Sequence, residues 1–263
     1  MEEEVRIAFA GDRDIAVWVF SFILEQNVFP HALIIPFSHK ASHAHRLLEL
    51  CSFLPRDRII VGDEFRGVRG ISLLKELSLD TIICIHFPYI VPKAVLSIPR
   101  YGVLNLHPAF LPYNRGWHTP SWAILEETPI GATLHFMDEG IDSGDIIHRK
   151  LLEVTPKDTA HSLYKRLKDL EFEVFKEAWP ILIQKSFQRI PQDPTKGTVH
   201  KREDLFKDTI QRFNLDETVR AGDLLRRLRG LTTNRIDESA YFKKDGMRYR
   251  VQVVIHEQPE SEK

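Results

Sequence analysis

Residues 102–108 read Gly-Val-Leu-Asn-Leu-His-Pro, an apolar strand that ends on an amide and an imidazole. Asn105 and His107 alternate with a leucine, so their side chains share one face of the strand. Pro108 lacks a backbone N–H and should stop the strand. Polar side chains at the carboxyl end of a buried strand lie where open α/β sheets bind ligands. This pair is therefore a candidate active site.

A carboxylate, Asp142, follows after a predicted helix and a further strand. Each of the three residues has an ordinary structural explanation, because a histidine can be buried in a core, and asparagine and aspartate often begin turns. The surrounding strings are more specific. They are Asn-Leu-His-Pro (105–108), Leu-Pro-Tyr-Asn-Arg-Gly (111–116) and Gly-Ala-Thr-Leu-His-Phe-Met-Asp-Glu-Gly-Ile-Asp-Ser-Gly-Asp-Ile-Ile (131–147).

Together these strings resemble the formyltransferase family that uses N10-formyltetrahydrofolate, and the resemblance covers about residues 1–185. In that family the matching residues carry the chemistry. The resemblance therefore implies that Asn105 donates a hydrogen bond to the oxyanion. It implies that His107 also binds the oxyanion and shuttles a proton near neutral pH. Asp142 would orient a histidine or a water and accept the proton, in a direct transfer without a covalent nucleophile.

The chain before residue 102 alternates short apolar runs with helical segments, which is the pattern of a doubly wound α/β sheet. No G-x-G-x-x-G follows Gly11, so we do not expect NAD. We predict a Rossmann-like, mostly parallel sheet with the formyltransferase fold. The predicted strands are 5–10, 32–36, 58–61, 81–85, 103–106, 130–137 and 146–152. The predicted helices are 15–25, 41–51, 71–77, 117–125 and a long one from Thr159, which Pro180 should bend or end.

The composition changes beyond Phe187, where the Pro-rich run 190–197 resembles a linker. We therefore predict a catalytic domain at 1–188 and a small C-terminal α+β subdomain at 189–263. The subdomain should contain a helix near 216–228, a hairpin whose strands 239–244 and 247–255 flank Asp245-Gly246, and a polar tail after His256. Alternation in the second strand predicts that Tyr249, Val251, Val253 and Ile255 face inward.

Composition excludes several classes of function. With 263 residues, 43% of them hydrophobic, the chain can bury a sizeable core. The 36 Lys and Arg nearly balance the 37 Asp and Glu, so we expect neither nucleic acid nor a membrane as a partner. No apolar run approaches a membrane span, and the acidic start Met1-Glu-Glu-Glu4 lacks a signal-peptide pattern. Cys51 and Cys84 lie in apolar patterns, which indicates reduced core residues of a cytoplasmic protein.

We expect no metal. His39, His43 and His45 are the one cluster with any metal-like spacing, but His43 and His45 cannot share a helix face.

The resemblance also implies two groups of binding residues. The loop after residue 85 and the segment before Asp142 would contact the folate co-substrate, and the string 113–120 resembles the sugar-nucleotide branch of the family. The folate residues are His86, Phe87, Pro88, Tyr89, Ile90, His135, Phe136, Met137, Asp138 and Glu139. The acceptor residues are Arg115, Gly116, Trp117, His118, Thr198, His200 and Lys201.

The expected acceptor is therefore a dTDP-linked amino-dideoxyhexose with its amine at C-3 or C-4, and the expected assembly is a homodimer. Such enzymes serve O-antigen and lipopolysaccharide biosynthesis. A glycinamide ribonucleotide transformylase would need a Gly-rich phosphate loop after the first strand. A methionyl-tRNA formyltransferase should carry a basic carboxyl domain, whereas residues 196–263 hold 15 Lys and Arg against 12 Asp and Glu. A methionyl-tRNA formyltransferase-like activity and a formyltetrahydrofolate hydrolase remain as alternatives, with a non-catalytic folate- or nucleotide-binding protein as a remote one.

Overall fold

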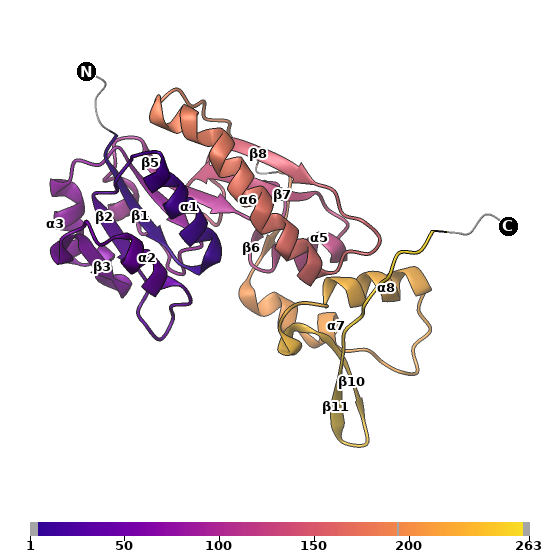
Figure 1. Cartoon of the computed structure of the whole chain (residues 1–263). Helices are drawn as coiled ribbons and strands as arrows, with labels where there is room; N and C mark the ends of the chain where they lie inside the picture. The colour runs from indigo at the N-terminus through magenta and orange to yellow at the C-terminus, as the bar shows by residue number, and fades with distance from the viewer. Residues whose placement is uncertain (1–4, 194, 260–263) are drawn as a thin grey trace. The chain divides into compact units, whose positions relative to one another are not determined.

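The computed structural model describes residues 5–193 and 195–259 (Figure 1). Contacts within the chain divide it into two units. Unit 1 comprises residues 1–107, 133–149 and 171–192, and unit 2 comprises residues 108–132, 150–170 and 193–263. The predicted boundary at residue 188 divides the chain in sequence order, whereas the two units are each assembled from several segments. The acidic start at 1–4, one linker position at 194 and the end of the polar tail at 260–263 lie outside the described residues.

The central feature of unit 1 is a mostly parallel sheet with strand order β3-β2-β1-β4-β5-β7-β8. The strands β1, β2, β3, β4 and β5 pair in parallel, and β5 pairs with β7 in antiparallel fashion. Continuous apolar runs such as Ile7–Gly11 are buried along their whole length, which confirms the α/β fold class. The strands are β1 (Ile7–Gly11), β2 (Ala32–Ile35), β3 (Ile59–Val61), β4 (Thr81–Ile85), β5 (Gly102–His107), β7 (Ile130–Phe136) and β8 (Ile146–Leu152).

Strand order reverses between β1 and β4, because β2 and β3 extend the sheet on one side of β1 and β4 and β5 extend it on the other. This is the topological switch point at which open α/β sheets bind ligands. The helices of this part of the chain are α1 (Arg13–Glu25), α2 (Ala44–Leu50), α3 (Val68–Glu76) and α4 (Lys93–Leu96), with 3-10 turns at Arg56–Arg58 and Gly62–Arg66.

The long helix α6 (Ala160–Ile183) begins one residue after the predicted start. Pro180 does not end the helix, as one of the two expected outcomes had it, because the helix continues for three more residues. The C-terminal half of α6 is held by aromatic packing on α1, where Phe22 makes edge contacts with Phe172, Phe175 and Trp179. These contacts offset the backbone hydrogen bond that a proline cannot donate.

Unit 2 contains the predicted hairpin, formed by β10 (Ala240–Lys244) and β11 (Met247–Val251). Asp245 and Gly246 both have positive φ, 50° and 78°, as a two-residue type I′ turn requires. The predicted inward direction of Tyr249 is wrong. Its side chain is 45% exposed and stacks on Phe242, 5.2 Å between ring centroids, because the described residues of unit 2 do not cover this face.

The remaining elements of unit 2 surround a small core of Trp122, Leu205, Leu231 and Ala240. Gly230 permits close packing of α8 on α5, since a Cβ there would lie 2.8 Å from the side chain of Leu125. The elements are β6 (Arg115–Gly116), α5 (Thr119–Leu125), β9 (Val199–His200), α7 (Asp208–Gln211) and α8 (Ala221–Gly230), with 3-10 turns at Arg202–Phe206 and Ile236–Glu238. In the part of the chain that the structure describes, no helix combines the length and apolar character needed to cross a bilayer.

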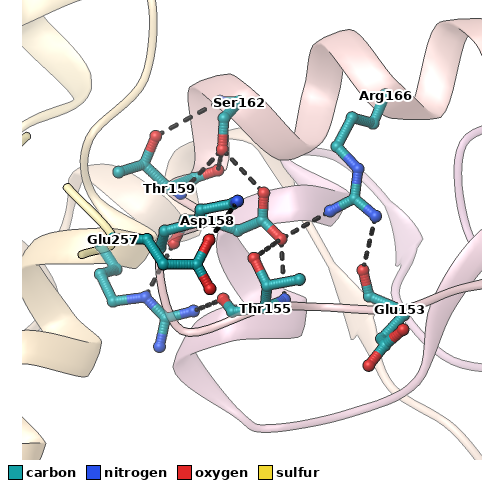
Figure 2. Close-up of polar contacts among 9 residues, drawn as sticks. Glu153, Thr155, Asp158, Thr159, Ser162, Arg166 and Glu257 are labelled. Carbon is teal, nitrogen blue, oxygen red and sulfur yellow. Dashed lines mark hydrogen bonds and ion pairs between the residues drawn. The ribbon is translucent and has the colours of Figure 1, made fainter. Parts of the chain in front are cut away.

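A buried carboxylate, Asp158, organises the turn that precedes α6 (Figure 2). It accepts hydrogen bonds from Thr155 N and Oγ1, from Ser162 Oγ and from Arg166 Nη1. Arg229 of α8 donates to the carbonyl oxygens of residues 158 and 155. Burial by itself would raise the pKa of Asp158, but these hydrogen bonds outweigh burial and lower the pKa below its usual value.

Asp158→Asn should lower the free energy of unfolding by about 1–3 kcal/mol, because an amide cannot accept all of these bonds and leaves buried donors unpaired. The carboxylate's contribution should be present above about pH 4, the ordinary aspartate value, and be lost as the pH falls through the depressed folded-state pKa. Denaturant unfolding of the two proteins between pH 3 and 7 measures this. Asp223→Asn, which removes an exposed ion pair with Arg226, is the matched control. An equal loss in both variants would contradict the assigned role.

Candidate active site

The predicted catalytic residues lie together at the carboxyl end of β5 in unit 1. The antiparallel pairing of β5 with β7 places His135 directly opposite Asn105. Asn105 Nδ2 lies 3.2 Å from His135 Nε2 and 3.2 Å from Asp142 Oδ1. His107 Nε2 lies 3.5 Å from Asp142 Oδ2, and the His107 side chain is 9% exposed. The sequence prediction that these side chains converge is therefore consistent with the geometry.

His135 has one definite tautomer when it is neutral. Its Nδ1 lies 2.7 Å from the carbonyl oxygen of Phe136, which can only accept, so Nδ1 carries the proton. Nε2 is then an acceptor for one amide hydrogen of Asn105, and Asp142 accepts the other. Both amide hydrogens of Asn105 are thus directed within the cluster, so donation to an oxyanion requires the amide to exchange one of these partners.

The loop that carries Asp142 has a defined shape. Asp142 has a left-handed φ of +48°, a conformation that short polar side chains tolerate best. Asp138 accepts hydrogen bonds from Ser143 Oγ and Gly140 N, which closes the loop on itself. Gln192 Nε2 donates to the carbonyl oxygens of Asp142 and Gly144 at 2.9 and 2.7 Å. Sequence reasoning missed Gln192, which lies in a Pro-rich run that shows no periodicity.

The loop predicted to bind folate follows β4. Phe87 and Tyr89 pack against each other and against Phe65, and the backbone N–H of Phe37 donates to the Tyr89 hydroxyl at 3.3 Å. Pro88 is exposed, and Ile90 is 86% exposed. The loop therefore has a fixed aromatic base and an exposed tip.

The predicted folate residues of β7 and the following loop do not all lie on one side. His135 faces the catalytic cluster, whereas Phe136, which alternates with it along the strand, contacts Phe187 and the guanidinium of Arg189. Met137 is half-buried, and Glu139 is exposed in an ion pair with Lys93 at 2.6 Å. The structure thus brings His135 to the triad and directs the Phe136 side chain elsewhere.

The predicted acceptor residues lie in unit 2, where β6 pairs in parallel with β9. This pairing aligns Arg115 with Val199 and Gly116 with His200, although the two stretches are more than eighty residues apart. The N–H of Arg115 donates to the carbonyl of Thr198, and the N–H of Trp117 donates to that of His200. The structure therefore joins the two strings that sequence analysis assigned to the acceptor. Lys201, next to His200, is exposed.

Two histidines of this region have unlike environments. The imidazole of His200 stacks on Trp122 with centroids 3.9 Å apart, and its Nε2 lies 3.1 Å from Glu126. Burial lowers the pKa of His118, although the charge of Glu238 opposes the shift, so His118 is neutral near pH 7. Trp117 is 52% exposed, with the guanidinium of Arg202 5.4 Å from its ring, and so offers an aromatic surface to a ligand.

The basic side chains of α8 are bound by groups of the protein itself. Arg227 donates to the carbonyl oxygens of Thr209, Ile210 and Arg212. Arg229 donates to the carbonyl oxygens of residues 155 and 158. Arg226 pairs with Glu127 and Asp223. Within the described ranges, no three or more His, Cys, Asp or Glu side chains form a group that could hold a metal ion.

Two family models match the chain. Residues 68–179 match the formyl transferase domain, and residues 206–257 match the N-formyltransferase dimerization C-terminal domain. Among curated relatives, the methionyl-tRNA formyltransferase of Pelotomaculum thermopropionicum is 32% identical over 61% of this chain and 50% of that protein. The dTDP-4-amino-4,6-dideoxyglucose formyltransferase of Mycobacterium tuberculosis is 28% identical over 70% of this chain and 76% of that protein. The chain thus spans about half the length of the first of these.

Solved structures share the fold. A sugar N-formyltransferase from Shewanella sp. superposes with a TM-score of 0.80 at 21% identity, covering 98% of this chain and 100% of that one. The N-formyltransferase from Helicobacter canadensis, in complex with folinic acid and dTDP-3-aminofucose, superposes with a TM-score of 0.66 at 19% identity, covering 92% and 85%. The two family models together match more than half of the chain, so this protein belongs to the formyltransferase family.

Proposed function

We propose that the protein transfers the formyl group of N10-formyltetrahydrofolate to the amine of a dTDP-linked amino-dideoxyhexose, at C-3 or C-4. The observation that carries the proposal is the convergence of Asn105, His107 and Asp142 in a chain of this family. The choice of acceptor is supported by the dTDP-amino-sugar enzyme of M. tuberculosis and by the dTDP-3-aminofucose complex of the H. canadensis protein.

In the proposed reaction the sugar amine attacks the formyl carbon and forms a C–N bond. The carbonyl oxygen becomes an oxyanion, which His107 and Asn105 stabilise by hydrogen bonds; a donor of this kind is typically worth about 10²- to 10³-fold in rate. Asp142 takes the proton from the attacking nitrogen. The oxyanion then collapses to the carbonyl of the new amide and the bond from the formyl carbon to N10 breaks. N10 receives the proton that His107 relays from Asp142, and the folate leaves as tetrahydrofolate. No covalent enzyme intermediate is required.

Three alternatives differ in what accepts the formyl group. Residues 196–263 have nearly balanced charge, which disfavours the polyanionic backbone of a tRNA as partner and hence a methionyl-tRNA formyltransferase. A formyltetrahydrofolate hydrolase would use water with the same three residues. A non-catalytic folate-binding protein would have no need for three side chains of the types that the chemistry requires.

We include a homodimer and a cytoplasmic location in the proposal. The dimer is supported by the match of residues 206–257 to a dimerization domain, and by Met247 and Tyr249, 62% and 45% exposed on the hairpin. The location is supported by two buried cysteines that are not in disulfides. Sedimentation velocity over a range of protein concentrations tests the dimer. A role in O-antigen and lipopolysaccharide biosynthesis would follow from the acceptor.

The testing experiment incubates the purified protein with N10-formyltetrahydrofolate and a panel of dTDP-3-amino- and dTDP-4-amino-dideoxyhexoses, with initiator methionyl-tRNA and a no-amine control alongside. Tetrahydrofolate is followed by absorbance and the sugar by mass. Formylation of one sugar supports the proposal and gives the position of the amine. Equal consumption of folate without any amine would favour the hydrolase, and binding of folate without turnover in any arm would favour a binding protein.

Gly116→Ala should raise the KM for the amino sugar about ten-fold or more with a smaller change in the KM for folate. Gly116 has φ +91°, and a Cβ there would lie 2.2 Å from the carbonyl oxygen of His200, so β6 and β9 cannot keep their pairing. Steady-state kinetics with each substrate varied measures this. Gly222→Ala is the control, because nothing lies within 4 Å of its added Cβ. An unchanged sugar KM would show that β6 and β9 do not form the acceptor site.

A further inference from the structure

His86 lies at the switch point of the sheet in unit 1. It directly follows β4, whose last residue, Ile85, pairs with Gly11 at the end of β1. The N–H of Asp12 donates to the Ile85 carbonyl at 3.2 Å, which ties the two strand ends together. His86 itself has a left-handed φ of +49°, a conformation that costs free energy for a residue other than glycine and persists only where neighbouring contacts hold it.

The contact that holds His86 comes from a distant residue. His86 Nε2 lies 2.7 Å from Glu171 Oε1 on α6. The Glu171 side chain is fully buried, and that of His86 is 14% exposed. Glu171 Oε2 has no hydrogen-bond partner among the described residues. Burying a carboxylate this deeply costs free energy unless a positive charge lies beside it. Protonated His86 supplies that charge.

The surroundings of His86 favour the protonated imidazole. Burial opposes the charge, but the Glu171 carboxylate outweighs burial through its charge and its hydrogen bond, and the pKa of His86 is raised. Two charged residues of α1 also act on His86. The charge of Arg13 lowers the pKa of the imidazole, and that of Asp14 raises it. Among the described residues, the ring of His86 makes its hydrogen bond through Nε2. Protonated His86 therefore has a second N–H donor, at Nδ1.

We infer that Glu171 is a positioning residue for the folate co-substrate, holding His86 as an oriented imidazolium whose Nδ1–H donates to the folate at the switch point. The inference rests on the proposed function and deepens it. His86 is the first residue of the loop predicted to bind folate. The His86–Glu171 pair therefore also fixes the position from which Phe87 and the rest of the loop continue. Folate affinity should then depend on the charge of one histidine that a single buried carboxylate controls.

The experiment compares Glu171→Gln with the unmodified protein. A neutral glutamine preserves shape and hydrogen bonding but removes the charge, so His86 should lose its proton at lower pH. We expect the KM for N10-formyltetrahydrofolate and the Kd for tetrahydrofolate to rise roughly ten-fold at pH 7.5, the effect of one charge-assisted hydrogen bond. kcat at saturating folate and the KM for the sugar should change little. Isothermal titration calorimetry supplies the Kd without turnover.

Glu177→Gln is the matched control. Glu177 lies six residues further along α6 and pairs with His148 at 2.8 Å, but this pair is exposed and distant from the switch point. The control should leave folate binding unchanged. If Glu171→Gln lowered only the melting temperature, with the folate Kd equal to that of the control, Glu171 would be structural and the inference would be wrong.

A second measurement needs no variant. In the unmodified protein the Kd for tetrahydrofolate should rise between pH 6 and 9 as His86 deprotonates, with a midpoint above the ordinary histidine value of about 6.5. A flat profile would overturn the inference. If the unmodified protein neither binds tetrahydrofolate nor consumes its formyl derivative, the proposed function fails first; if it does both and the profile is flat, only the role of Glu171 fails.

Discussion

His107→Ala should lower kcat for formyl transfer by about 10²- to 10⁴-fold, the range in which a positioned acid or base contributes. The imidazole is 3.5 Å from the Asp142 carboxylate at the end of β5, and alanine removes both the oxyanion donor and the proton shuttle. Substrate binding should be weakened less, because the predicted folate and sugar contacts are made by other residues. Single-turnover measurement of tetrahydrofolate release separates chemistry from binding.

The control for this variant is His148→Ala, which removes a partly exposed histidine of unit 1 that pairs with Glu177. Circular dichroism and the folate Kd should show that both variants are folded and bind co-substrate. If His107→Ala retained more than about a tenth of the kcat while His148→Ala was normal, His107 would not be the proton shuttle, and Asp142 alone would have to serve.

Asp142→Asn should also lower kcat, by about 10²-fold or more, with little change in the melting temperature. Asparagine has the same shape and tolerates the left-handed φ of +48° at this position, and the backbone carbonyl that Gln192 binds is retained. The variant therefore removes the base and leaves the loop in place. The carboxylate that accepts an amide hydrogen of Asn105 at 3.2 Å becomes a group with its own donors.

Single-turnover kinetics at pH 7.5 tests this role, with Asp63→Asn, an exposed carboxylate paired with Arg66, as the control. The control should keep the kcat of the unmodified protein. A kcat for Asp142→Asn within about two-fold of the unmodified protein would remove Asp142 from the reaction.

Much of the fold could be predicted from local patterns. Each apolar run before residue 108 became a strand within about two residues of its predicted ends, because parallel strands covered on both faces need continuous apolar side chains. Asp245-Gly246 predicted its turn, since both residues accept positive φ. Tyr249 shows the limit. Alternation says which side chains share a face, but only the packing of other elements determines whether that face is covered.

The candidate site could likewise be predicted only in part. Asn105 and His107 were identified from the strand that carries them, and Asp142 from the string that follows. Nothing in the sequence assigns a partner to Arg227 or Arg229, but the folded chain directs both to carbonyl oxygens. No local pattern distinguishes a basic residue that faces solvent from one that ties two segments together.

The sequence by itself determined the sheet, the hairpin and the chemical types of the candidate catalytic side chains, because these depend on residues within one strand or turn. Only the tertiary structure decided which distant groups contact the residues of the candidate site. Glu171 lies 85 residues from His86 and Gln192 lies 50 from Asp142. The physical reason is that a buried hydrogen bond depends on where two segments meet in space, and a single sequence does not record which of its polar side chains will meet there.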